Sequence, residues 1–383
     1  MIDKKILRKQ VDIKRHINER IADWKNSKPQ MDRLWYANIL TYRGEQWVTF
    51  DYSQLRFRRS NQRRTIPRPV TNKYASIANS LISAILRFDP RNVFAPQTDT
   101  QEDVNTAFAG NKIDNAIMHE IKWQCRKAEL APWYVLTGNA FTIAGIDMSA
   151  GPKVRYIKSF CPACGETYDV KEEDGQYDCE RCAEEDGVKS PLQPEMDETG
   201  QPKATVKRAG ALALDLASPF EMFLDPRISD LDDHQSIARI HNKSVEWVKE
   251  RWPEAADRVK PEVRPELNTR LLGTLATLTH PAAVSMEHDT TDVVEFWEKP
   301  CEKFEQGFYC VLNGDEILEL RPFVWISKRE EPYFPITHWR YDTVPGTIWG
   351  KTPMTDLVEK QRTRNRIEAI AGGEAIGQKM IDP

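Results

Sequence analysis

The sequence lacks any run of about 18 apolar residues, which a membrane-spanning helix would need. Its basic first residues are not followed by the apolar core of a signal peptide, so we expect neither membrane insertion nor secretion. An excess of positive charge is also missing, since 54 Lys and Arg stand against 58 Asp and Glu. Proteins that grip nucleic acid with their whole surface are usually strongly basic, so that mode of binding is not expected.

Common catalytic motifs are absent as well. There is no nucleophile elbow, zinc-protease helix motif or dinucleotide-binding glycine run, and the seven histidines are dispersed. The segment 346–352 looks like a phosphate-binding loop. However, three residues separate Gly346 from Gly350, where four are needed, and Pro353 follows at once. We therefore predict no nucleotide site.

Acidic residues cluster near position 230, as Asp230, Asp232 and Asp233 followed by His234. Such a cluster could hold a hard metal for phosphoryl chemistry. The segment lacks the glycine at which a calcium-binding loop turns, so we interpret it as a solvated acidic turn. We predict that the protein is not an enzyme.

Seven cysteines are present, an odd number that does not indicate a disulfide framework. Four of them form two Cys-x-x-Cys pairs, Cys161 with Cys164 and Cys179 with Cys182. Two such turns supply the tetrahedral set of four sulfurs that structural Zn²⁺ takes, with iron as the alternative metal. Because four thiolates leave no open position for water, we predict a structural zinc site. Residues 161–200 carry 13 acidic and three basic side chains, which favours contact with protein over nucleic acid.

Hydrophobic periodicity predicts an α+β protein, because helical and strand patterns come in mixed blocks without βαβ alternation. We expect helices at 6–24, 30–41, 71–88 (capped by Thr71), 104–131, 133–136, 244–252 and 267–278. We expect strands at 140–146, 154–160, 206–207, 212–216 and 293–297, and a hairpin over 309–320 that turns at Asn313 and Gly314.

The segment 333–365 reads as an extended stretch, a tight loop and a long helix. Thr352 is a suitable cap and Pro353 suits the first helical position. Gln361 and Asn365 continue the apolar row of Leu357 at four-residue steps. We therefore expect the helix to leave its core there and to face a partner or water.

Between residues 55 and 68 there are six arginines and no acidic residue. They form either a solvated or ion-paired loop, or a basic arm that contacts nucleic acid or an acidic partner. These residues are Arg56, Arg58, Arg59, Arg63, Arg64 and Arg68.

Four short segments, in their order and spacing, resemble those of portal proteins of tailed bacteriophages. They are 42–47, 68–72, 218–226 and 349–353, the last followed by Gln361 and Asn365. The resemblance extends from about residue 35 to 368. It implies a ring, usually of twelve subunits, at the capsid vertex, through which DNA is packaged and ejected.

On this resemblance, residues 1–160 form an N-terminal helical and wing region and 206–345 a β-rich wing region. Residues 161–205 form a zinc-ribbon insertion, which portal proteins need not have, and 346–383 begin a stem helix. The implied channel or stem positions are Gln361, Arg362, Asn365 and Arg366. Since portal-like chains continue into clip, second stem helix and crown, we expect the sequence to be truncated.

The resemblance also implies partners: copies of the chain itself, terminase, the major capsid or scaffolding protein, a head–tail adaptor, and double-stranded DNA passing through the channel. The implied location is the virion, after assembly in the host cytoplasm, with no membrane contact. The alternative is a zinc-ribbon nucleic-acid enzyme or accessory subunit, of the nuclease or transposase kind. Its site would combine the acidic cluster near Asp230 with the Arg-rich loop.

Overall fold

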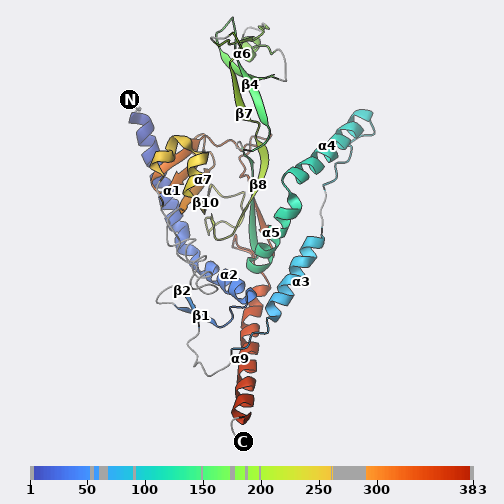
Figure 1. Ribbon diagram of the computed structural model, residues 1–383, viewed down its shortest axis with the longest axis vertical. Helices are drawn as coiled ribbons and strands as arrows, with labels where there is room; N and C mark the ends of the chain where they lie inside the picture. Colours follow the sequence, from blue (N-terminus) through green and yellow to red (C-terminus); the bar gives the residue numbers. More distant parts are fainter. Residues whose placement is uncertain are drawn as a thin grey trace. The chain divides into compact units, whose positions relative to one another are not determined.

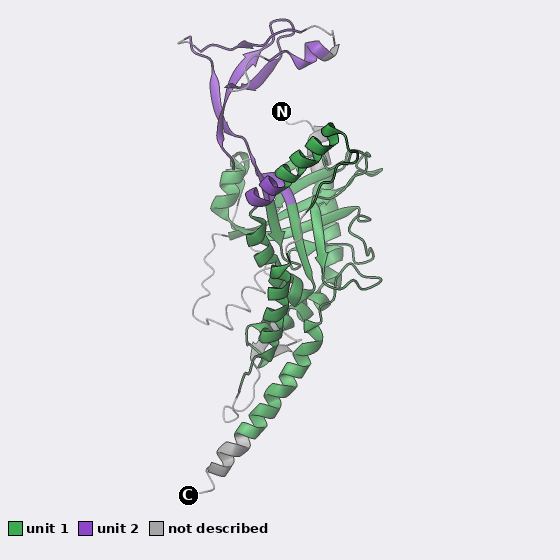
Figure 2. Ribbon diagram, turned by 90° about the vertical axis from the view of Figure 1, so that its right-hand side faces the viewer, with its two compact units in different colours: residues 1–114, 122–143, 214–383 green, residues 115–121, 144–213 purple. Residues whose placement is uncertain are grey.

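The computed structural model describes residues 4–51, 56–59, 68–88, 92–147, 150–172, 177–185, 189–197, 200–259, 261 and 290–379. The fold is α+β, as predicted (Figure 1). Its residues form two compact units (Figure 2). Unit 1 draws on residues 1–114, 122–143 and 214–383, and unit 2 on residues 115–121 and 144–213.

The helices lie mostly in unit 1. They are α1 (Lys4–Ser27), α2 (Pro29–Tyr42), α3 (Lys73–Arg87), α4 (Gln101–Glu120), α5 (Trp123–Thr137), α6 (Glu180–Glu185), α7 (Val245–Arg251), the 3₁₀ helix η2 (Pro253–Arg258) and α9 (Met354–Lys379).

The strands form four sheets. They are β1 (Val48–Asp51), β2 (Arg56–Arg59), β3 (Asn139–Asp147), β4 (Lys153–Phe160), β5 (Thr167–Lys171), β6 (Gln193–Pro194), β7 (Ala204–Arg208), β8 (Ala211–Ala217), β9 (Met222–Phe223), β10 (Ser236–Ser244), β11 (Thr290–Glu298), β12 (Phe308–Asn313), β13 (Glu316–Arg321) and β14 (Ile336–Arg340). The largest sheet is antiparallel, in the order β13-β12-β11-β10-β9. The others are β1-β2, β14-β3-β8, and β5-β4-β6 with β7 also paired to β4.

The five-stranded sheet separates two hydrophobic cores, since successive side chains of a strand point to opposite faces. On one face, Phe296 and Phe308 pack with Ile13, Ile17 and Trp24 of α1, which confirms the amphipathic helix expected there. The other face contributes Trp297 and Tyr309 to the larger core, which also includes side chains of α2, α3, α5 and α9. The base of α9 is thus part of the main core of unit 1.

The single long helix expected over 104–131 is wrong, because two helices occupy this segment. Helix α4 ends at Glu120 and α5 begins at Trp123. The residue between them, Lys122, adopts a left-handed conformation with φ 53°, which no continuous helix accommodates. Hydrophobic periodicity continues across this break, so the pattern does not indicate it. The short helix expected at 133–136 is the last part of α5.

Two local predictions are shifted by one residue. The cap of α3 is Asn72, whose Oδ1 accepts from Ala75 N, and not Thr71. The two-residue turn between β12 and β13 is Gly314–Asp315, with φ 56° at Gly314, and not Asn313–Gly314. In both cases a neighbouring residue supplies the same chemistry. The helix expected at 267–278 lies outside the described residues.

Candidate metal centre and the base of helix α9

The first cysteine pair lies at the end of β4. Cys161 follows Phe160 directly, and its carbonyl accepts a 2.9 Å hydrogen bond from Gly165 N. Gly165 has φ +73°, a conformation that glycine adopts without steric cost, so the chain reverses into β5. Cys161 N donates to Glu166 O at 2.8 Å, which closes the turn. The sequence therefore forms the tight knuckle expected of the first Cys-x-x-Cys.

The second pair lies at the start of α6. Cys179 N donates to Ser190 O, and Ala183 N donates back to Cys179 O. Cys182 is carried by the first turn of α6, three residues on. The two knuckles thus come from different secondary structure, a strand end and a helix start.

These turns bring four sulfur atoms together. All four Sγ atoms lie within 4.8 Å of one another; Cys161 is 3.8 Å from Cys182, and Cys164 is 3.5 Å from Cys179. A tetrahedral zinc ion with sulfur ligands at about 2.3 Å places its sulfurs about 3.8 Å apart. All four thiols are free, and three are buried while Cys164 is exposed. The donor set and its spacing therefore fit one tetrahedral metal ion.

Two hydroxyl groups contact the buried sulfurs. Ser190 Oγ lies 3.3 Å from Cys161 Sγ, and this hydrogen bond lowers the pKa of Cys161 to about 6. Tyr168 Oη lies 3.4 Å from Cys179 Sγ and lowers the pKa of that thiol. Both contacts favour the thiolate form that binds metal. Sequence reasoning missed Tyr168 and Ser190, because no spacing rule ties them to the cysteines.

The acidic cluster near position 230 has a different organisation. His234 is buried, and its ring nitrogens contact the backbone carbonyls of Asp230 and Asp225. Burial lowers the pKa of His234, whereas the two carbonyl contacts raise it, because both ring nitrogens donate only when the ring is protonated. Among the described residues, only the four cysteines are grouped as ligands of a metal would be. His234 therefore holds the turn together through its ring.

The base of α9 crosses the segment that links α5 to β3. Thr352 accepts a hydrogen bond from Met354 N, as a cap, and its hydroxyl donates to Val135 O. A Cβ atom on Gly350 would lie 2.5 Å from Gly138 O, so the two backbones meet where no side chain fits. Asn139 pairs with both backbone groups of Gly350, at 2.7 and 3.0 Å. The helix start is thus locked to the core.

The expectation that Gln361 and Asn365 face a partner or water is wrong within this chain, because both are buried, at 5% and 2% exposure. Gln361 accepts from Tyr74 N and donates to Thr71 O, so it satisfies backbone groups at the start of α3. It also donates to Asn365 Oδ1, and Asn365 donates to Gln46. The polar row on α9 is therefore buried because its partners are polar groups at the start of α3 and the Gln46 side chain.

Gln46 extends this network by donating to Asn72 Oδ1 at 2.9 Å. Asn72 in turn donates to Tyr42 O. We call the side chains of Gln46, Asn72, Gln361 and Asn365 the amide network. It joins the end of α2, the start of α3 and the middle of α9, and three of the four segments singled out in the sequence contribute to it.

The remaining predicted positions are dispersed. On α9, Arg362 pairs with Glu359 and Arg366 is exposed. Of the six arginines of the predicted basic arm, Arg56, Arg58 and Arg59 lie in β2. Arg68 is exposed, and Arg63 and Arg64 lie outside the described residues.

Within the described part of the chain, none of the helices combines the length and apolar character that crossing a bilayer requires. No model of a known protein family matches the sequence, and no similar curated protein is found. The relation to portal proteins therefore stays a prediction that depends on the four short segments.

Proposed function

We propose that this chain is a subunit of a portal-like ring, a conduit for DNA at the vertex of a phage capsid. The observation that carries the proposal is the amide network. The segments that resemble portal proteins lie far apart in the sequence, yet Gln46 joins Asn72 to Asn365 of α9 through hydrogen bonds. A helix that is held at its base by Thr352 and Gly350, and further along by the amide network, suits a stem that lines a channel.

The distal part of α9 supports the same proposal. Ile367 and Ile370 are exposed on a helix whose buried side includes Val358 and Ala369. Arg366 is exposed near them. Apolar side chains outside the core favour contact with another helix of the assembly. In the proposed ring, Arg362 and Arg366 lie toward the channel, while Gln361 and Asn365 anchor the helix.

In this proposal the four cysteines hold one structural Zn²⁺ ion. Tyr168 and Ser190 support the thiolates, and the metal supplies folding free energy to unit 2. The proposed partners are further copies of the chain, terminase, capsid or scaffolding protein, a head–tail adaptor and the DNA that passes through. The proposed location is the virion.

Electron microscopy of the purified full chain, under assembly conditions, tests this function. We expect closed rings with a central opening wide enough for a DNA duplex. A chain that stays monomeric under all such conditions, or that cleaves DNA with Mg²⁺ unaided, would overturn the proposal. The second outcome would favour the alternative of a zinc-ribbon nucleic-acid enzyme.

A further inference from the structure

Unit 2 carries its charges of opposite sign in separate parts. Residues 148–160 and 201–213, which include β4 and β7, hold six basic side chains and no acidic one. Residues 161–200, between them in the sequence, hold 13 acidic and three basic side chains. A chain whose net charge is −4 thus gathers cations on one pair of strands. Such a local excess attracts an anionic partner.

Part of this strand pair is a two-stranded ribbon. β4 pairs with β7 over residues 153–157, and with β5 only from Tyr156 onward. Within the described part of the chain, residues 153–155 and 206–208 therefore pair only with each other (Figure 1). We call these six residues the ribbon. Two of them are valines and the other four are basic: Lys153, Arg155, Lys207 and Arg208.

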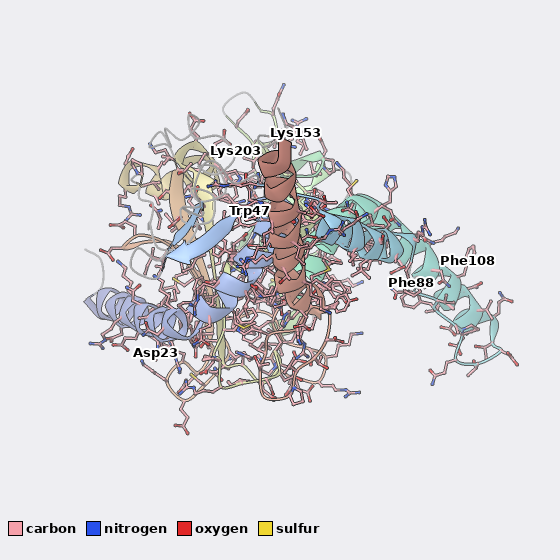
Figure 3. All side chains as sticks on the ribbon, turned by 90° about the horizontal axis from the view of Figure 1, so that it is seen from below. Asp23, Trp47, Phe88, Phe108, Lys153 and Lys203 are labelled. Atoms are coloured by element: carbon pink, nitrogen blue, oxygen red, sulfur yellow. The ribbon has the colours of Figure 1, made fainter. Side chains whose placement is uncertain are left out.

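Like charges face each other across the ribbon. Lys153 and Arg208 are direct partners in the strand register, so their side chains leave the same face of the ribbon. Arg155 lies two residues along β4 and therefore shares this face. All three residues are exposed, and Lys153 is labelled in Figure 3. Because like charges directly opposite destabilise a strand pair, this arrangement favours a role in binding an anion.

The backbone holds the two opposed cations in place. Gly151 and Gly210 both have φ of +83°, and a Cβ atom on Gly151 would lie only 2.3 Å from Gly210 O. Next to them, Ala209 N donates to Pro152 O at 3.0 Å. Arg208 itself donates from Nη1 to Gly151 O at 3.1 Å. Separation of the strands at this end would relieve the repulsion, but it would break these contacts.

Two of the four cations have carboxylate partners that another anion can replace. Arg155 pairs with Glu172 at 3.2 Å, and Lys207 pairs with Asp169. These four side chains are between 34% and 53% exposed. Ion pairs in contact with solvent contribute little to stability, so exchange of their anion costs little. For Lys153, no carboxylate partner is found among the described residues.

A DNA duplex suits the ribbon better than an acidic protein does. The major groove of DNA, about 12 Å wide, admits a two-stranded β-ribbon. Lys207 leaves the face opposite to that of Arg208, so cations are directed to both sides of the ribbon. Protein interfaces are depleted in lysine, whereas lysine and arginine supply many of the contacts to phosphate.

We propose that the ribbon binds double-stranded DNA through its phosphates. This contact is separate from the proposed channel, because none of the ribbon residues belongs to α9, and it does not require a ring. It therefore goes beyond the proposed function by giving unit 2 a DNA contact of its own.

Fluorescence anisotropy of a short labelled duplex, with the full chain at several salt concentrations, tests this contact. Each phosphate contact adds about 0.9 to the steepness with which log affinity falls with log salt, so four contacts give about 3.6. We expect the double variant Lys153→Gln/Arg208→Gln to bind more weakly and to lower this slope by about 2, and Arg155→Gln to lower it by about 1. Lys249→Gln/Lys303→Gln removes the same charge from exposed positions of unit 1 and is the matched control, with an unchanged slope.

Thermal unfolding shows whether the variants are folded. The double variant loses the opposed charges, so we expect it to melt at or above the wild-type temperature; if it melts lower, Arg155→Gln decides. A folded variant with the affinity and slope of the control, or a wild type that binds no duplex at about 50 mM salt, would overturn the proposal. Polyglutamate that binds the wild type more tightly than the duplex does, and not the double variant, would assign the ribbon to an acidic protein instead. None of these measurements depends on ring assembly, so the two proposals fail separately.

Discussion

At the scale of single residues, the four cysteines of the candidate metal centre have unequal surroundings. Cys161, Cys179 and Cys182 are buried, whereas Cys164 is open to solvent. Burial raises the pKa of Cys182, while hydrogen bonds lower the pKa values of Cys161 and Cys179. A bound cation removes this conflict, since it stabilises four thiolates at once.

Substitution of one cysteine tests whether the four sulfurs bind a metal ion together. Metal analysis of the purified wild type is expected to give about one zinc ion per chain, in keeping with a closed four-sulfur site. Cys179→Ser is expected to lose most of it, because three sulfurs no longer complete the tetrahedron. Cys125→Ser, at an exposed cysteine outside unit 2, is the control and retains its zinc. Less than about 0.2 tetrahedral metal per wild-type chain would remove the site.

The buried side chain of Lys28 leads to a second prediction, on how stability depends on pH. It is buried, donates to Phe220 O at 2.7 Å and lies over the Phe223 ring. Burial lowers its pKa from 10.5 to about 8. Between these values the unfolded chain binds the proton and the folded chain does not, so this residue makes stability rise with pH.

Urea unfolding at several pH values tests whether the Lys28 contribution to the free energy of unfolding rises with pH. Relative to Lys28→Met, the wild type is expected to gain stability from pH 8 to about 10.5, and the difference is flat below pH 8. Lys249→Met removes an exposed lysine and serves as the control. An unchanged or falling difference across that interval would contradict the lowered pKa.

At the scale of elements, the amide network holds α9 to the start of α3. Gln361→Leu keeps the size of the side chain but leaves Tyr74 N and Thr71 O without their partner. Loss of such buried hydrogen bonds costs about 1–3 kcal/mol of unfolding free energy. Arg366→Leu, on the exposed side of the same helix, is expected to change it by less than about 0.5 kcal/mol. Equal effects from both variants, in chemical unfolding, would argue against the network.

The crossing of Gly138 and Gly350 is a backbone contact, so it predicts a steric effect. Gly350→Ala places a methyl group 2.5 Å from Gly138 O. Because backbone atoms cannot move aside cheaply, we expect a loss of about 1–3 kcal/mol or more in unfolding free energy. Gly145→Ala meets nothing within 4 Å and is the control. Thermal unfolding distinguishes the two.

Local signals in the sequence predicted most elements, and tertiary pairing accounts for the errors. The cap at Thr352 and the amphipathic face of α1 are local, and both are confirmed. The burial of Gln361 depends on a helix start nearly 300 residues away, which no periodicity reports. The cysteine cluster could be predicted because each pair has the Cys-x-x-Cys spacing in the sequence. Tyr168 and Ser190 have no such spacing, and only the fold brings them to the sulfurs.

At the scale of the whole molecule, the two units are expected to respond differently to metal removal. The described core of unit 2 around the cysteines consists of three cysteines with Tyr168 and Leu192. So small a core supplies little folding free energy, and a metal ion bound by the four cysteines would add to it. After chelation, limited proteolysis is expected to cut within 144–213, while the large core of unit 1 stays resistant. Simultaneous cutting of both units would show that they fold together.

The way the chain enters and leaves unit 2 has a further consequence. It departs along β3 and returns along β8, and these strands are hydrogen-bonded neighbours in one sheet. The two ends of the segment 144–213 are therefore adjacent in the β14-β3-β8 sheet. A segment whose two ends are neighbours can be inserted or shortened while the strands that carry it keep their pairing.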